Sequence, residues 1–326
     1  MTLPYTMRLL CLCCASFFMI HLALAIATRL GAGTAVRIAE HMKPSSAARM
    51  LFALRMAPPV LASFAVLAFC IPSYLWLEPE ATGEKVGLFC ALTALLGVAV
   101  CASSAWRVTG AVRGTNRYLH DCERHGERIT VPGEAAPALL LSDKAPVLAV
   151  AGVLHPQLVI SKRVMSGLSL EQREAALSHE RAHCDSGDNF KRFLILLAPD
   201  ALPFCATFRG MERAWSKFTE WAADDQASAG DPHRALSLAS ALVNVAKMGS
   251  KPRVGYLSCS LVGGAQELSE RVDRLLRPQP KPGKPVREVV ALISSTAALA
   301  ATALAVTTVW PGSLSLVHQV LERLVR

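Results

Sequence analysis

Charged side chains are scarce in this sequence. Asp, Glu, Lys and Arg make up 18% of the 326 residues, whereas hydrophobic residues make up 52%, and the mean hydropathy is +0.35. Soluble domains usually contain about 25% charged residues. The composition therefore argues against an ordinary soluble enzyme and favours a protein that buries apolar surface in a lipid bilayer.

Acidic residues are the rarer charge type, with 25 against 34 basic residues and a formal net charge of +9. The sequence also lacks interleaved basic and aromatic residues and zinc-finger spacing, so it does not predict direct binding of nucleic acid. The basic residues lie beside apolar runs instead. That placement suits the anionic inner face of a membrane.

The apolar residues gather in four long runs, at residues 9–26, 51–77, 86–106 and 288–310. Each is near the roughly 20 residues that cross a bilayer as a helix, and a helix satisfies its own backbone there. The fold class expected is a mainly α membrane protein with four transmembrane helices. Three of them fall in residues 1–107.

The loops between these runs differ in charge. The first is basic, whereas the second contains Glu78, Glu80 and Glu84. The positive-inside rule then places the first loop and the large region 108–287 in the cytoplasm, with both chain ends outside. Residues 311–326 form a short extracytoplasmic tail. A cleaved signal peptide at the amino terminus is the alternative for the first run, and it leaves the later topology unchanged.

Region 108–287 has the pattern of an α+β domain. Helices are expected at residues 108–124, from 170 onward and at 211–229, and strands at 138–141, 147–150 and 157–160. Ser169 and Gln172 form a capping box for the second helix. The apolar stretch 193–208 contains Pro199 and Pro203, so we expect a broken helix against the domain core. The strand at 157–160 is expected to offer an edge for an extended peptide.

The second of these helices carries His179-Glu180-Arg181-Ala182-His183. Residues four apart lie on one face of a helix, so both imidazoles can bind one zinc ion. The intervening Glu180 then faces the position where water binds and can act as the catalytic base. The pattern predicts a metallopeptidase with one Zn²⁺ per chain.

A site of this kind needs a third protein ligand. Glu220 is the first candidate, and from spacing alone Asp188 and Glu212 are equally good. Asp224 lies one turn after Glu220 and can hydrogen-bond a ligating histidine. The oxyanion formed during peptide hydrolysis also needs a donor, and the candidates for that role or for substrate contact are Tyr256, Arg271, His233 and His155.

These motifs together resemble the BlaR/MecR family of membrane zinc peptidases. The resemblance rests on the histidine motif with Asp188-Asn189, on residues 152–160 before it, on residues 220–225, and on the closing segment 269–276. It covers nearly the whole chain, and it extends more distantly to the prenyl-protein peptidase and HtpX group. It implies a gluzincin-like domain between the third and fourth helices, with Glu220 as third ligand and Asp224 as its companion.

The same resemblance implies a multi-pass protein of the bacterial cytoplasmic membrane. Its substrate would be a protein or peptide, with a transcriptional repressor as one possibility. Receptors of the family carry an outer β-lactam sensor after the fourth helix, and residues 311–326 are too few to form one. Two alternatives stay open: a quality-control peptidase of the HtpX type, and a membrane scaffold without catalytic activity.

Overall fold

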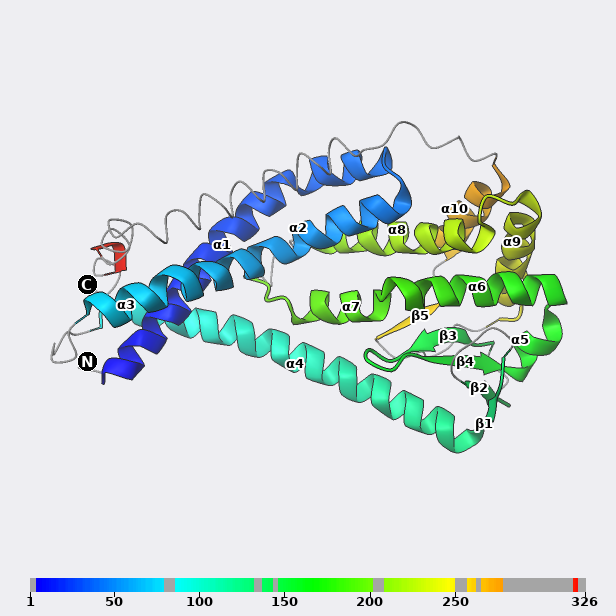
Figure 1. Ribbon diagram of the computed structural model, residues 1–326, viewed down its shortest axis with the longest axis horizontal. Coiled ribbons are helices and arrows are strands. Elements are labelled where there is room, and N and C mark those ends of the chain that lie inside the picture. Colours follow the sequence, from blue (N-terminus) through cyan, green and yellow to red (C-terminus); the bar gives the residue numbers. More distant parts are fainter. Residues whose placement is uncertain are drawn as a thin grey trace.

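The computed structural model shows a mostly helical protein with one small mixed sheet (Figure 1). The residues that it describes are 4–78, 86–131, 137–142, 146–201, 208–249, 257–261, 265–277 and 319–321. Within them, three helical segments are long and apolar enough to cross a membrane: Tyr5–Glu40, Pro44–Leu77 and Leu88–His125. They contain the first three predicted spans. The expected fourth span, residues 288–310, lies outside the described residues.

The first two spans form a helical hairpin. Helix α1 covers Tyr5–Glu40, and the second span is divided into α2 (Pro44–Ala65), the π-helical segment η1 (Val66–Cys70) and α3 (Ile71–Leu77). Pro58 and Pro59 lie inside α2. Proline has no backbone N–H, so the carbonyls four residues earlier lose their helical donors. The second span is therefore less regular than the first.

Helix α4 runs without a break from Leu88 to His125. The two helices expected at 86–106 and 108–124 are thus one helix, and the expected domain boundary at residue 107 falls inside it. Gly97 lies where α4 meets α1, because a Cβ there would come within 2.6 Å of the Cys14 carbonyl oxygen. A small residue at this position lets the two membrane helices approach closely.

The sheet has the strand order β1-β2-β4-β3-β5. Its strands are β1 (Gly126–Ile129), β2 (Ala138–Leu141), β3 (Leu148–Ala151), β4 (Gln157–Ser161) and β5 (Ser258–Ser260). The predicted edge at 157–160 is wrong, because β4 pairs with β2 on one side and β3 on the other. Its unbroken apolar run fits an interior strand. The edges are β1 and β5.

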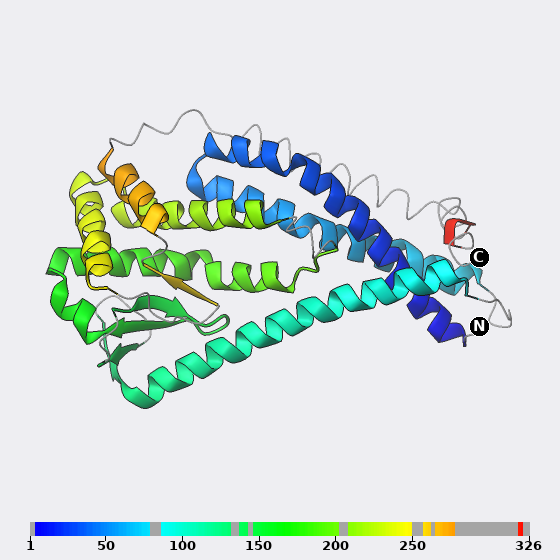
Figure 2. The ribbon, with the colours of Figure 1, turned by 180° about the vertical axis from the view of Figure 1, so that it is seen from behind.

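Six further helices complete the described part of region 108–287, which is called the polar domain below. They are α5 (Lys162–Gly167), α6 (Leu170–Ser186), α7 (Asp188–Leu197), α8 (Arg209–Ser228), α9 (Pro232–Lys247) and α10 (Ala265–Leu276). Buried side chains of α6, α9 and the sheet form one core, which includes Ala176, Leu242 and Ile160. Seen from behind, α6 and α8 run side by side, and the α1–α2 hairpin lies along α8 (Figure 2).

The stretch 193–208 is broken, as expected. Helix α7 ends at Leu197, and Ala198 is extended because the next residue is Pro199. Its packing differs from the prediction. Ile195 and Phe208 share a core with Leu51 of α2 and Trp215 of α8, so this stretch joins the membrane hairpin to the polar domain.

Candidate metal centre

Helix α6 holds three polar side chains in the protein interior. Its start is fixed by the capping box, in which the Gln172 backbone N–H donates to the Ser169 hydroxyl and the Ser169 N–H donates to the Gln172 side chain. His179, Glu180 and His183 are all buried. Buried polar groups are costly unless they are partnered, so their presence on the buried face of a helix indicates a function.

His179, His183 and Glu220 face one another and are referred to below as the metal cluster. The Nε2 atoms of the two histidines are 3.1 Å apart. Glu220, on α8, places Oε2 3.5 Å from Nε2 of His179 and Oε1 3.6 Å from Nε2 of His183. These three residues are the one group in the described chain whose ligand atoms could hold a metal ion together.

The spacing fits a zinc ion. Zinc binds imidazole nitrogen and carboxylate oxygen at about 2.0–2.2 Å in a tetrahedral arrangement, which puts neighbouring ligand atoms about 3.3–3.5 Å apart. The distances in the metal cluster lie close to this range. Two imidazoles and one carboxylate are also a donor set typical of catalytic zinc. The residues present therefore fit the metal that the sequence predicts.

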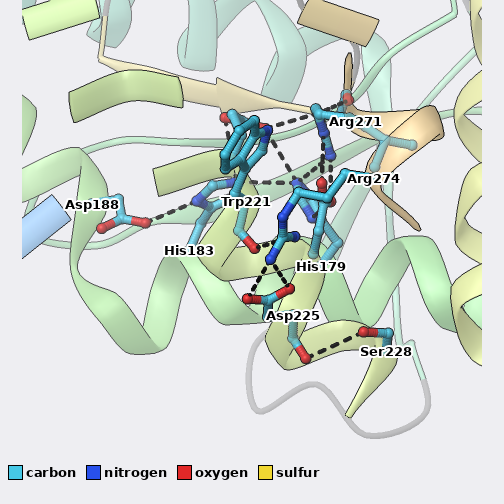
Figure 3. Close-up of polar contacts among 11 residues, drawn as sticks. His179, His183, Asp188, Trp221, Asp225, Ser228, Arg271 and Arg274 are labelled. Carbon is cyan, nitrogen blue, oxygen red and sulfur yellow. Dashed lines mark hydrogen bonds and ion pairs between the residues drawn. The ribbon is translucent and has the colours of Figure 1, made fainter. Parts of the chain in front are cut away.

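Carboxylates hold the other nitrogen of each histidine. Nδ1 of His183 donates to Asp188 at 2.9 Å (Figure 3), and Nδ1 of His179 lies 3.0 Å from Asp224. Such contacts fix the ring so that Nε2 is left for the metal. Asp188 thus partners a ligand, and the alternative of Asp188 as third ligand is wrong. The sequence signal was Gly187, whose φ of 65° ends α6, so that Asp188 begins α7 five residues after His183.

Arg271 of α10 links the carboxylates of the site. Its Nε and Nη2 atoms donate to Asp224 at 2.9 and 2.7 Å, and Nη1 lies 2.9 Å from Oε2 of Glu220. Nη1 also donates to the Leu261 carbonyl at 2.8 Å, next to strand β5. The guanidinium is buried and its donors are largely engaged. Arg271 therefore holds Glu220 and Asp224 in place.

The charges of the site keep two of its acids ionised. Burial alone would raise the pKa of Glu220, but Arg271 and the two histidines outweigh it and hold that pKa well below its usual value. Burial likewise opposes the charge of Asp224, yet Arg271 and His179 keep its pKa below the ordinary range. Both carboxylates are therefore anionic at neutral pH.

Glu180 differs from these two acids. It is buried, and neither of its carboxylate oxygens has a hydrogen-bond partner among the described residues. Burial raises its pKa to about 7, although the two histidines act in the opposite direction. A buried acid with such a pKa is poised to exchange a proton at neutral pH.

A second set of contacts lies beside the cluster on α8. Arg274 binds Asp225 and lies over the ring of Trp221, with 5.1 Å from its guanidinium carbon to the ring centre (Figure 3). Lys217 lies over the same ring, with 4.6 Å from its amine to the ring centre. The sequence does not predict this group, because nothing in the residue spacing pairs α8 with α10.

The remaining candidates are placed elsewhere. His155 and His233 are exposed, in the turn before β4 and at the start of α9, and neither contacts the metal cluster in the described structure. Glu212 binds Arg55 at 2.8 Å, so Glu212 is also wrong as the alternative third ligand. Tyr256 lies outside the described residues. Of the four suggested contact residues, the described structure brings Arg271 to the cluster.

The comparisons with known proteins agree with this geometry. No curated protein and no solved structure matches the chain at a significant level. A family model described as BlaR1 peptidase M56 matches residues 81–275, which is more than half of the chain and includes the whole metal cluster. The chain therefore belongs to the BlaR1 peptidase M56 family.

Proposed function

We propose that this protein is a membrane-embedded zinc metalloendopeptidase that hydrolyses a protein substrate on the cytoplasmic side. The observation that carries the proposal is the buried, unpartnered carboxylate of Glu180 next to a two-histidine, one-carboxylate cluster. The family and the three apolar helices support a membrane peptidase.

The proposed mechanism assigns each side chain one task. His179, His183 and Glu220 would hold zinc, which polarises a peptide carbonyl and makes water more acidic when it is bound there. Glu180 takes the proton of the attacking water and returns it to the leaving amine. Asp188 and Asp224 keep the two imidazoles oriented, and Arg271 keeps Asp224 and Glu220 oriented.

Strand β5 is the edge that suits substrate binding. It pairs with β3 on one side, and its last residue is followed by Leu261, whose carbonyl accepts from Arg271. An extended peptide added to this edge would run toward the metal cluster and be selected mainly through its backbone. That mode suits unfolded or loop segments of proteins.

The cytoplasmic side follows from the charge of the loops. The turn between α1 and α2 and the adjoining helix ends are basic, with Arg29, Arg37, Lys43 and Arg49 opposed by Glu40, and the positive-inside rule places this end of the hairpin inside. Leu321 packs with Leu12 and Tyr74 at the end of the bundle away from α10, which supports a fourth crossing. Alkaline phosphatase fused after Arg124 should be inactive and after Arg326 active. The reverse result would place the domain outside.

Two roles are open for the proposed peptidase: regulatory cleavage, for example of a transcriptional repressor, and membrane-protein quality control. The identity of its substrates distinguishes these roles. Mapping of new protein amino termini should reveal cleavage products in cells with the wild-type chain that are lost with Glu180→Gln. Glu174→Gln, an exposed change of the same kind on α6, is the matched control. One or a few products would favour regulation, and many membrane-protein products quality control. No difference between wild type and Glu180→Gln would support the scaffold alternative.

A further inference from the structure

Arg55 is a buried arginine in the middle of membrane helix α2, with 3% of its side chain exposed. A charge inside a membrane helix is costly and usually has a functional reason. The sequence analysis did not assign one, because Arg55 lies outside the metallopeptidase motifs. Its contacts all lead to the polar domain.

One contact is with α8, the helix that carries Glu220. Arg55 Nε donates to Oε1 of Glu212 at 2.8 Å. Glu212 lies two turns before Glu220 on the same helix. A change in the position of Glu212 along or around α8 is therefore passed to the metal cluster by a rigid helix.

The other contact is with the end of α7, the helix that begins at Asp188. Arg55 Nη2 donates to the Ala198 carbonyl at 3.3 Å, and the guanidinium lies 4.5 Å from the centre of the Phe208 ring. Asp188 holds His183 from the first turn of α7. One arginine thus contacts α8, which carries Glu220, and the end of α7, which carries Asp188.

Neighbouring membrane helices contact the same two-residue segment. His21 of α1 donates from Nε2 to the Pro199 carbonyl at 3.2 Å, and Arg107 of α4 lies 3.5 Å from the Ala198 carbonyl. All three described membrane helices therefore bind the end of α7. Arg55 differs from His21 and Arg107 because it also binds α8.

The backbone of α2 is weakened next to this contact. Pro58 and Pro59 leave the carbonyls of Leu54 and Arg55 without their helical donors. Leu51, one turn before Arg55, packs with Trp215 of α8. Arg55 thus lies one turn before the two prolines that make the second span irregular.

We propose that Arg55 is a positioning residue for the metal centre: it fixes α7 and α8 relative to each other, and through them His183 and Glu220. This role rests on the proposed zinc site. It differs from a general contribution to stability, because the zinc affinity of folded protein depends on it.

The test measures zinc affinity of the full-length chain in detergent, with zinc alone as the probe. The variants are Arg55→Lys, which keeps the charge but not the two-sided contact, and Glu212→Ala, which removes only the α8 partner. Arg49→Met is the control, because Arg49 is exposed on the same helix and bonds, in the described part of the chain, to Ser45 and Ser46. Circular dichroism and size exclusion verify folding.

Both variants should bind zinc about tenfold more weakly, at the lower end of the effect of losing an orienting partner, and Arg49→Met should match wild type. Folded Arg55→Lys and Glu212→Ala with wild-type affinity would overturn the positioning role. If Arg55→Lys does not fold, Glu212→Ala decides by the same criterion. A wild-type chain that binds no zinc would instead overturn the proposed function, and this proposal with it.

Discussion

Two buried arginines show how differently the two parts of this molecule use charge. Arg271, in the polar domain, binds both Asp224 and Glu220 together with the Leu261 carbonyl. Arg55, in a membrane helix, binds one carboxylate, and that of Glu212 is 33% exposed. The first arginine balances the charge of a closed site, and the second joins two regions that could move against each other.

This difference has a physical cause. Around Arg271 the partners are ionised, with Asp224 buried and Glu220 18% exposed, so removal of the arginine leaves their charges uncompensated. Around Arg55 the guanidinium is stacked on Phe208 and shares the Ala198 carbonyl with Arg107. Loss of one of these contacts leaves the others in place. We therefore expect it to change the positions of α7 and α8 more than the free energy of unfolding. The predictions below separate these two behaviours.

The largest effect on peptidase activity is expected at Glu180, the acid of the site that neither arginine binds directly. Glu180→Gln should lower peptidase activity by about 10²–10⁴-fold, because the amide cannot accept the proton of the attacking water. Zinc content should be unchanged, since the metal cluster is intact. Single-turnover assays paired with metal analysis check this, with Glu174→Gln as the control. Full activity in Glu180→Gln would mean that another group is the base.

A graded loss of zinc affinity should distinguish the three acids that the sequence left as alternatives. Glu220→Ala removes a ligand and should abolish tight binding. Asp188→Ala removes the partner of His183 and should weaken zinc binding about 10–100-fold. Glu212→Ala should weaken zinc binding less than Asp188→Ala does. Zinc titration against a competing chelator measures the order. A larger loss in Asp188→Ala than in Glu220→Ala would contradict the assigned ligands.

Replacement of the two arginines should affect stability unequally. Arg271→Met leaves the buried Asp224 and the partly buried Glu220 without their cation, which should cost about 3–5 kcal/mol of unfolding free energy. Arg55→Met should cost less, because Glu212 can turn toward water. Denaturation in detergent, by fluorescence and circular dichroism, gives both values. Equal losses of unfolding free energy in the two variants would contradict the proposed difference between Arg271 and Arg55.

The smallest effect concerns Asp200, which follows the end of α7. Burial raises its pKa, with Arg55 acting in the opposite direction, and its Oδ1 has no hydrogen-bond partner among the described residues. A raised pKa means that the folded protein holds the proton more tightly than the unfolded chain. The associated stability is present below the unfolded pKa and is lost as pH rises through the folded pKa.

Asp200→Asn should therefore melt at a higher temperature than wild type at pH 7, and this advantage should shrink on acidification toward pH 4, near the ordinary pKa of aspartate. Thermal melts across this range provide the measurement. Asp121→Asn, an exposed change on α4, serves as the control. An advantage that is the same at all pH values would show that the charge of Asp200 is not its cause.

The sequence predicted the parts of the site that lie close together along the chain. The histidine pair and Glu180 share one helix, and the capping box marks where that helix begins. Glu220 was the first ligand candidate, but spacing alone ranked Asp188 and Glu212 equally with it, because helical spacing cannot select a partner on another helix. The family resemblance favoured Glu220, and the structure places Asp188 against Nδ1 of His183.

The Arg55 contacts could not be predicted from the chain at all. Arg55, His21 and Arg107 belong to three helices, and their partners follow α7 or lie on α8. Only the packing of α1, α2 and α4 against α7 and α8 brings them together. The strand order was missed likewise, because β5 joins the sheet from about 100 residues after β4 in the chain.

The zinc content of the purified chain tests the central claim most directly. Full-length wild type prepared without chelator should contain about one zinc per chain, as expected for a single site of two histidines and one carboxylate. Replacement of both His179 and His183 by alanine should remove it from protein that remains folded. Wild type without zinc, or undiminished zinc in the double variant, would contradict the metal centre.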